Sequence, residues 1–283
     1  MTSQLTEEQN TKLRQLEPFG WELMGLNIAE TVSSEIVNLI KQRLAHSGVV
    51  VLRNQFVNDD DFVGFLKRLG TLTFTTGETP VAHQPMLNVV TNVGRATPPR
   101  SVFHTDTSYV QKPPNYTALR AIALPSTGGE TLFCNQYRAY ETLPTWVKEQ
   151  LSDSKLLHVV SGLTLSEQDE QQAWHPLFRR HPISNKISLF LSTPERCVKI
   201  SGLSTDISPD NSPNISSNIS KRVIRLLYKH SIRSAYIYRH YWHEGDIVIW
   251  DNRCTLHRAD HSRVVGDRIL HRGLIAGEAP IPA

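Results

Sequence analysis

The residues best suited to chemistry are two histidines and one aspartate that could hold a metal ion. His104 and Asp106 are separated by a single residue, Thr105. In a β-strand, residues i and i+2 point to the same face, so His104 and Asp106 could contact one ion while Thr105 points away. Together with the distant His257 they form a set of two histidines and one carboxylate. This set leaves coordination positions open and is the usual one in non-haem Fe(II) oxygenases.

Two arginines follow His257 and indicate an anion beside the metal. Arg268 and Arg272 lie eleven and fifteen residues after His257, in the largely apolar segment 268–275. A cation in a buried strand needs an anionic partner, because an unpaired buried charge is costly. The spacing of four residues turns both guanidinium groups to the same face of a strand. The pattern predicts a pocket for a metal ion and a carboxylate ligand.

A structural interpretation competes with this one. The chain has twelve histidines, and only His104 has an acidic residue two places on. A lone His-x-Asp pair is more often a hydrogen-bonded pair in a strand, and a lone strand arginine is more often part of a surface salt bridge. The order and spacing of the whole set favour the functional interpretation.

These residues, with two further motifs, resemble those of a known family. The matching segments are His104-Thr105-Asp106, LPSTGGET at 124–131, Trp250-Asp251-Asn252-Arg253, His257, Arg268 and Arg272. In them the chain is similar to the TauD/TfdA (taurine/alpha-ketoglutarate dioxygenase) family of Fe(II)- and 2-oxoglutarate-dependent oxygenases. Weaker similarity runs from about Gly25 to Gly277. The resemblance is specific for the family and much less specific for the substrate.

The resemblance implies a role for the matched side chains. His104, Asp106 and His257 would bind Fe(II), leaving positions for the cosubstrates 2-oxoglutarate and O2. Arg268 would pair with the far carboxylate of 2-oxoglutarate, which a planar guanidinium binds bidentately. The hydroxyl of Thr131 would add a hydrogen bond to this cosubstrate.

Four further residues have less specific implied roles. Arg272 would contact either the substrate or the cosubstrate. Arg100 lies where relatives have a substrate-facing residue, although a solvated loop arginine is the more common role. Trp250 and Asn252 would set the turn that leads to His257 and supply hydrogen bonds behind the metal ligands.

The implied reaction is oxidation of a substrate C–H bond, with release of succinate and CO2. Hydroxylation is the expected outcome, and desaturation or cyclisation of a biosynthetic intermediate is an alternative that uses the same residues. Taurine enzymes carry a histidine near positions 71–75, where this chain has threonines, which argues against taurine itself. We expect a small anionic metabolite, such as a sulfonate, an aryloxy-carboxylate or an amino-acid-derived acid.

Two other classes are alternatives. A non-catalytic jelly-roll binding protein would make the metal ligands incidental, and the complete triad with Arg268 counts against it. A zinc hydrolase could use the same His/Asp/His set, but it would not explain two arginines.

Composition is that of an ordinary globular chain. The 283 residues are 39% hydrophobic and 20% charged, with a net charge of +3. The small charge and the absence of a lysine or arginine run argue against nucleic acid as a partner. No apolar stretch approaches the roughly 20 residues of a membrane span. The polar N-terminus and the three cysteines without metal-site spacing predict a cytoplasmic protein with reduced thiols. The oligomeric state, a homo-oligomer included, stays open.

The elements that must position the site are mostly short strands. Helical spacing predicts helices from Ser33 to about residue 47, from Asn58, over 136–151 with a break at Pro144, and over 220–230. Strands are predicted at 49–52, 116–124, 130–134, 156–160, 177–180, 187–191, 235–242, 246–249 and 268–276. This pattern predicts a mainly β fold with helices, a double-stranded β-helix (jelly-roll, cupin-like) core with flanking helices.

The expected organisation is a polar N-terminal arm over residues 1–17 and a single TauD-like dioxygenase domain over 18–283. The segment 202–217 is rich in Ser, Pro, Asp and Asn and is expected to be a loop. Two interpretations of this segment stay open: an active-site lid and a surface insertion.

Overall fold

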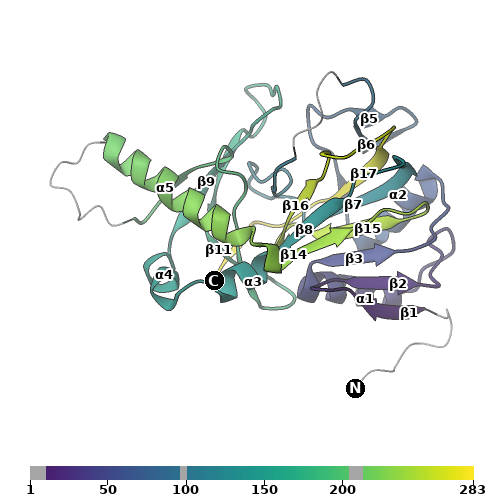
Figure 1. Ribbon diagram of the computed structural model, residues 1–283, viewed down its shortest axis with the longest axis horizontal. Helices are drawn as coiled ribbons and strands as arrows, with labels where there is room; N and C mark the ends of the chain where they lie inside the picture. Colours follow the sequence, from purple (N-terminus) through teal and green to yellow (C-terminus); the bar gives the residue numbers. More distant parts are fainter. Residues whose placement is uncertain (1–10, 96–100, 204–212) are drawn as a thin grey trace.

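The computed structural model describes residues 11–95, 101–203 and 213–283, with the backbone alone for 213–217. In this part of the chain four sheets carry most of the regular structure, and five α-helices flank them (Figure 1). One sheet has nine strands and the other three have three strands each. The predicted mainly β fold is therefore confirmed.

The nine-stranded sheet forms one wall of the molecule. Its order is β1 (Lys12–Gln15), β2 (Trp21–Met24), β3 (Val49–Leu52), β15 (Ile247–Asp251), β7 (Tyr116–Ala123), β17 (Ile269–Ile275), β6 (Gln84–Thr91) and β5 (Pro80–Val81), with β4 (Leu72–Thr73) also paired to β17. All its ladders are antiparallel except the parallel pair of β2 and β3. Strand β17 lies between β7 and β6.

A three-stranded sheet faces this wall and completes the jelly roll. Its order is β14 (Ile237–His240), β8 (Thr131–Asn135) and β16 (Thr255–Ala259). Phe133 of β8 packs between the sheets with Leu119, Val248 and Trp250 of the large sheet. A second three-stranded sheet has the order β10 (Gln172–Pro176), β9 (Lys155–Val159) and β13 (Cys197–Ile200). A third has the order β12 (Ile187–Leu189), β11 (Phe178–Arg180) and β18 (Ile281–Pro282).

Helices cover the outer face of the large sheet. The helices α1 (Ser34–Ser47) and α2 (Asp59–Leu69) bury apolar side chains against alternate residues of β3, such as Val50 and Leu52, while Val49 and Val51 face the inner core. Both helices begin where predicted, because the Ser33 hydroxyl and the Asn58 side chain accept hydrogen bonds from backbone N–H groups of their first turns.

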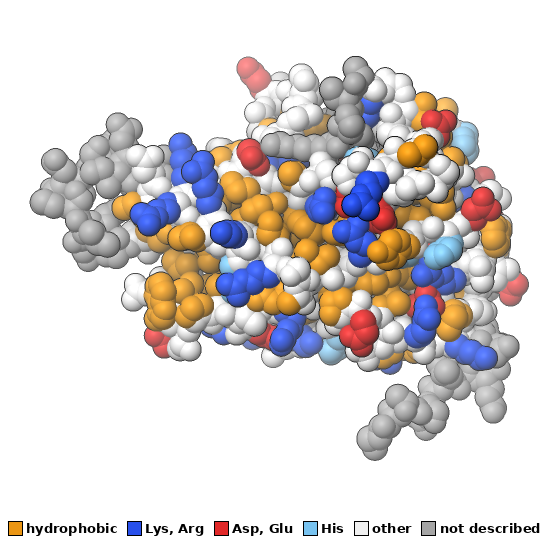
Figure 2. All heavy atoms as spheres, viewed as in Figure 1, with side chains coloured by type: hydrophobic (Ala, Val, Ile, Leu, Met, Phe, Trp, Pro, Cys, Tyr) orange, Lys and Arg blue, Asp and Glu red, His pale blue; other side chains and the backbone are white. Residues whose placement is uncertain are grey.

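A second apolar cluster joins the three-stranded sheets to the helices beside them, with Leu132 of β8, Leu156 of β9 and Leu189 of β12 among its members. The helices α3 (Gln136–Glu141) and α4 (Thr145–Gln150) are separated at Pro144, as predicted, and α5 (Pro213–Ser231) lies on the side away from the large sheet (Figure 1). Ile224 and Leu227 of α5 are buried in this cluster. The opposite face of α5 carries exposed basic residues, visible as blue side chains over α5 in Figure 2: Lys221, Arg222, Arg225 and Lys229. They form the solvated side of an amphipathic helix.

Several elements differ from the sequence predictions. Lys12–Gln15, inside the predicted polar arm 1–17, forms β1 and pairs with β2. The short strands β10, β13 and β16 were not predicted, because four or five residues give too little alternation to recognise. Helix α5 begins at Pro213, inside the predicted loop 202–217, since proline is tolerated in a first helical turn. Residues 204–212 of that segment lie outside the described residues, so its role as a lid is untested.

None of the helices in the described ranges is both long enough and apolar enough to span a membrane.

Candidate active site

The structure brings the three predicted metal ligands together. His257 lies on β16, and His104 forms a two-hydrogen-bond bridge with it through their backbones, with both N···O distances 2.9 Å. The Nε2 atoms of His104 and His257 are 3.7 and 3.8 Å from Oδ1 of Asp106. Ligand atoms of all three lie within 4.8 Å of one another. In the described ranges they are the one such group of three or more His, Cys, Asp or Glu residues.

The predicted reason for this convergence was wrong in one respect. Residues 103–106 do not form a strand, since His104 makes only the isolated bridge and Asp106 begins a turn. The turn, not strand alternation, brings the carboxylate beside the imidazole. Thr105 is held away from the site because its hydroxyl donates to the Leu191 carbonyl at 3.1 Å.

The protonation states of this group fit a divalent metal. Burial lowers the pKa of His257 to about 3, and burial also lowers the pKa of His104, so both imidazoles are neutral at physiological pH. Burial alone would raise the pKa of Asp106, but the neighbouring His257 and Arg272 bring it below its usual range, so it is ionised. Neutral imidazole and carboxylate are the forms that bind a metal.

The tautomer of His104 also fits. Its Nδ1 lies 2.9 Å from the Val102 carbonyl, which can only accept a hydrogen bond. Nδ1 therefore carries the proton, and the Nε2 lone pair faces the other two ligands.

Arg268 is a buried cation that has no carboxylate partner in the described part of the chain. It is 1% exposed, and its Nε donates to the Gly129 carbonyl at 2.8 Å. No carboxylate of the described residues lies within 4.0 Å of its guanidinium. Burial lowers its pKa to about 10, which leaves it charged at neutral pH. Gly129 permits this approach, because its φ is +80° and a Cβ there would lie 3.0 Å from Arg268 Cδ.

The hydroxyl of Thr131 is arranged to donate to a further group. It accepts hydrogen bonds from Arg268 Nη2 and from Trp242 Nε1, both at 3.1 Å. A hydroxyl has two lone pairs and one proton, so both lone pairs are used and the proton is left for an acceptor. Arg268 and Thr131 together thus form a site for an anion such as a carboxylate. Trp242 was not predicted from the sequence, since its distance of 111 positions from Thr131 gives no local signal.

Arg272 lies on β17, which begins just after Arg268, and it faces the metal group. His271, the residue before it, points to the outer face and contacts Asp59 of α2 at 2.8 Å, as strand alternation requires. Nη1 of Arg272 lies 3.6 Å from Asp106 Oδ1, and its Nη2 lies 3.2 Å from Oε1 of Glu78. Glu78 was not predicted, because it belongs to a loop without a recognisable motif.

A further guanidinium acts on the metal ligands electrostatically. Burial is the main cause of the lowered pKa values of His104 and His257, and the positive charge of Arg196 contributes to both. Arg196 is half-buried, donates from Nε to Ser161 Oγ at 3.0 Å, and has no acidic partner within 4.0 Å in the described ranges. Arg100, the other predicted substrate contact, lies outside the described residues.

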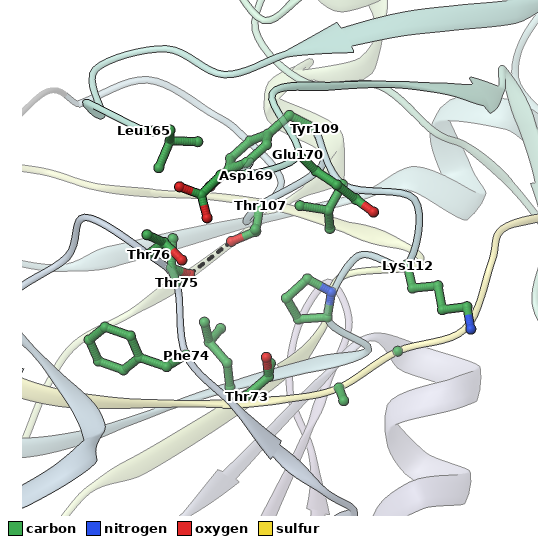
Figure 3. Close-up of a pocket in the computed structure, with 15 residues that line it drawn as sticks. Thr73, Phe74, Thr75, Thr76, Thr107, Tyr109, Lys112, Leu165, Asp169 and Glu170 are labelled. Atoms are coloured by element: carbon green, nitrogen blue, oxygen red, sulfur yellow. Dashed lines mark hydrogen bonds between the residues drawn. The ribbon is translucent and has the colours of Figure 1, made fainter. Parts of the chain in front are cut away.

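A cavity of about 270 Å³, whose lining is drawn in Figure 3, begins at Thr107, the residue after the metal ligand Asp106; none of the three metal ligands is among its lining residues. Thr107, which follows Asp106, and Leu274, two residues after Arg272 on the same strand face, both line it. The cavity is therefore on the side of Arg272 away from Arg268. Its wall is a mixture of hydroxyl, apolar and charged side chains: Thr73, Phe74, Thr75, Thr76, Tyr109, Leu165, Asp169 and Glu170. Figure 3 shows Thr75 and Thr107 hydrogen-bonded to each other across it, at 3.0 Å.

The turn after β15 delivers His257 to the site. Asp251 pairs with Arg253 through two contacts of 2.6 and 2.8 Å, and its Oδ2 lies 2.9 Å from His181 Nε2. Asp251 is completely buried. Burial would raise the pKa of Asp251, but Arg253 and His181 bring it well below its usual range. The Asp-Asn-Arg segment therefore sets the turn, as its position before His257 predicted.

Asp251→Asn is expected to destabilise the protein by about 3–5 kcal/mol, because it leaves the buried Arg253 with only the partly exposed Glu278, 3.5 Å from its Nη1, as a counter-charge. A depressed carboxyl pKa contributes stability above the unfolded-state pKa, and this contribution is lost as pH falls through the folded-state value. The difference between wild type and variant, measured by urea unfolding, should therefore be full at neutral pH and shrink in acid. Asp153→Asn, at an exposed position, is the control and should change little. Equal stability of wild type and Asp251→Asn at neutral pH would contradict this account.

Comparisons with known proteins show the family of this chain. The chain matches the model of the taurine catabolism dioxygenase TauD, TfdA family over residues 11–274. It is 25% identical over 289 residues to an alpha-ketoglutarate-dependent 2,4-dichlorophenoxyacetate dioxygenase of Cupriavidus pinatubonensis, covering 90% of this chain and 94% of the relative. It is 27% identical to an alpha-ketoglutarate-dependent sulfate ester dioxygenase of Pseudomonas putida, covering 93% and 88%.

The fold has the same relatives. The crystal structure of a taurine dioxygenase from Burkholderia xenovorans superposes with a TM-score of 0.79 and 25% sequence identity, covering 96% of this chain and 93% of the other. The family model matches nearly the whole chain, and the matched residues include the metal group, Arg268 and Arg272. The chain therefore belongs to the taurine catabolism dioxygenase TauD, TfdA family.

Proposed function

We propose that this protein is an Fe(II)- and 2-oxoglutarate-dependent dioxygenase that oxidises, by hydroxylation, a C–H bond of a small monoanionic metabolite. The observations that carry the proposal are the group of His104, Asp106 and His257 and the buried cation Arg268, which has no carboxylate partner among the described residues. The relatives named for 2,4-dichlorophenoxyacetate and for sulfate esters act on small molecules with an anionic group, which supports the substrate class. The three free, buried cysteines support a cytoplasmic location.

The protein's own residues bind and orient the reactants. Fe(II) would supply the activation of O2 that is coupled to decarboxylation of 2-oxoglutarate. His104, Asp106 and His257 would hold the metal from one side, which leaves the other side open. Arg268 would bind the far carboxylate of 2-oxoglutarate bidentately, and the remaining proton of the Thr131 hydroxyl would add a hydrogen bond. The substrate would occupy the cavity beside Thr107 and Leu274.

The formal charges of the site favour a monoanionic substrate. Fe(II) and Asp106 together carry one positive charge, and bound 2-oxoglutarate brings two negative charges. Arg268, Arg272 and Arg196 add three positive charges, and Glu78 removes one. These groups around the metal and cosubstrate then have an excess of one positive charge, which one anionic group on the substrate neutralises; Asp169, Glu170 and Lys112 of the cavity wall are not part of this count. We place that group beside Arg272, where a substrate would compete with Glu78.

The decisive test is reaction with the cosubstrate. Addition of 2-oxoglutarate to the anaerobic Fe(II) protein should produce a new visible absorption band, and exposure to air with a substrate should yield succinate. A panel of alkyl sulfonates, aryloxyacetates and their neutral alcohol analogues, screened for stimulated O2 consumption, identifies the substrate class. Absence of any spectral change and of succinate with the metal-loaded protein would overturn the proposal.

Arg272→Gln is expected to weaken binding of the anionic substrate by at least about tenfold, since each 1.4 kcal/mol of lost charge pairing is a factor of ten. The loss should disappear for the neutral analogue, and the Michaelis constant for 2-oxoglutarate should stay the same. Steady-state kinetics with both reactants varied make this distinction. If the loss falls wholly on 2-oxoglutarate, Arg272 braces the cosubstrate and the substrate need not be anionic.

Glu78→Gln is the matched control for Arg272. It removes the carboxylate that pairs with Arg272 and leaves the guanidinium in place. Anion binding should become tighter, because the substrate no longer competes with an internal carboxylate.

A further inference from the structure

A chain of hydrogen bonds leads from Trp250 to the metal-ligand group. Trp250 Nε1 donates to Asn252 Oδ1 at 3.0 Å, and Asn252 Nδ2 donates to Thr117 Oγ1 at 2.8 Å. Thr117 Oγ1 donates to Asp106 Oδ2, also at 2.8 Å. All four residues are buried, with Thr117 at 0% exposure. We name this set of four residues the Trp250–Asp106 chain.

The direction of every bond in the chain is determined by its two ends. An indole N–H can only donate, so the carbonyl of Asn252 must face Trp250 and its amide must face Thr117. A carboxylate can only accept, so the single hydroxyl proton of Thr117 must point to Asp106. The two constraints agree, so the donor and the acceptor of each of the three hydrogen bonds are fixed.

The chain engages only one oxygen of Asp106. Thr117 is bonded to Oδ2, whereas Oδ1 is the atom that lies 3.7 and 3.8 Å from the two histidine Nε2 atoms. Among the residues that the structure describes, Thr117 is the one whose side chain donates a hydrogen bond to Oδ2 of Asp106. Thr117 is itself fixed in the middle of the large sheet, where β7 pairs it with Trp250 on one side and Leu274 on the other.

We infer that Thr117 is a positioning residue that keeps Asp106 a one-oxygen ligand of the metal. The inference rests on the proposed Fe(II)/2-oxoglutarate function. A carboxylate that turned to bind through both oxygens would occupy a second coordination position. Two histidines and one carboxylate oxygen would leave open positions on the metal for 2-oxoglutarate and O2. By occupying Oδ2, the Thr117 hydroxyl would keep these positions available.

The same tryptophan also contacts a second metal ligand. The ring centroids of Trp250 and His257 are 4.4 Å apart. Trp250 therefore packs against one ligand and reaches Asp106 through Asn252 and Thr117. The orientations of these two ligands are coupled through one buried indole.

Thr117→Val tests the inference, because valine has a similar shape but no hydroxyl, and Thr117→Ser is the variant that keeps the hydroxyl. The probe is Co(II), titrated anaerobically into the metal-free full-length protein and followed by its visible absorption. Loss of a hydrogen bond behind a metal ligand typically lowers metal affinity about 10–100-fold. We expect a loss of this size in Thr117→Val, with a weaker Co(II) band as the coordination number rises, and near wild-type behaviour in Thr117→Ser.

Two further variants make the result independent of general destabilisation. Ser188→Ala removes a fully buried hydroxyl that donates to the Arg253 carbonyl and contacts no metal ligand, so its Co(II) affinity and spectrum should match wild type. Asn252→Ala removes the donor to Thr117 and should weaken Co(II) binding in the same direction by a smaller factor. If Thr117→Val does not fold, as judged by circular dichroism, the comparison of Asn252→Ala with Ser188→Ala decides.

A folded Thr117→Val protein with the Co(II) affinity and spectrum of wild type would overturn the inference, as would equal losses in Thr117→Ser and Thr117→Val. Failure of the proposed function gives a different result. In that case 2-oxoglutarate leaves the spectrum of the wild-type metal complex unchanged, while the difference between the serine and valine variants can still be measured.

Discussion

Replacing His104, Asp106 or His257 by alanine is expected to abolish metal binding and the turnover of 2-oxoglutarate in each variant. The three ligand atoms lie within 4.8 Å of one another, and the described ranges hold no other group of three such residues. Removing one member leaves two ligands, which are too few to hold Fe(II) against water. Metal content after reconstitution and succinate formation are the measurements.

The fold should survive these substitutions, because none of the three residues belongs to the apolar clusters that hold the sheets together, although His257 does pack against Trp250. Circular dichroism and urea unfolding are expected to resemble wild type. His83→Ala is a suitable control, since His83 pairs with Asp59 at 2.8 Å outside the site and its side chain is 68% exposed. It should retain full metal binding. Any triad variant that keeps full turnover removes that residue from the ligand set.

Arg268→Ala is expected to raise the Michaelis constant for 2-oxoglutarate by at least about tenfold, since truncating one partner of a buried charge pair typically costs about 2–5 kcal/mol and each 1.4 kcal/mol is a factor of ten. The guanidinium is 1% exposed and is placed beside the Thr131 hydroxyl, whose proton is left for an acceptor. Metal binding should be unchanged, because Arg268 does not contact the three ligands. Initial rates at varied 2-oxoglutarate and a Co(II) titration measure the two effects separately.

Two variants calibrate this result. Arg268→Lys keeps the charge and loses the bidentate geometry, so its Michaelis constant should lie between those of wild type and alanine. Arg138→Ala removes an exposed arginine of α3 and should leave the constant unchanged. An unchanged constant in Arg268→Ala would mean that the cosubstrate carboxylate binds at another residue.

The sequence suggested His104, Asp106 and His257 as one metal group, and the structure brings their ligand atoms within 4.8 Å of one another. The role of Arg268 came from the family resemblance and stays a prediction; its spacing from His257 covers the rest of β16 and the loop that leads to β17. Helices α1 and α2 were also predicted closely, because their caps, Ser33 and Asn58, act within one helical turn. These signals depend on residues that are close in the sequence, so they can be recognised without the tertiary structure.

The three-dimensional arrangement decided what lies around those residues. Thr117, Glu78, Arg196 and Trp242 are ordinary residues in ordinary segments, and no spacing marks them. Thr117 reaches Asn252 across 135 positions, and Trp242 reaches Thr131 across 111. Such contacts depend on which strands become neighbours, which is a property of the whole sheet and not of any segment.

Even the predicted convergence of His104 and Asp106 had a different physical cause. The sequence by itself determined that a histidine and a carboxylate stand two residues apart, and strand alternation was one way to align them. In the tertiary structure this segment forms a turn. The turn is held by the backbone bridge between His104 and His257 and by the hydrogen bond from the Thr105 hydroxyl to the Leu191 carbonyl. A backbone with no regular pairing of its own takes its shape from the elements that pack around it, and β16, which carries His257, is too short to be recognised in isolation.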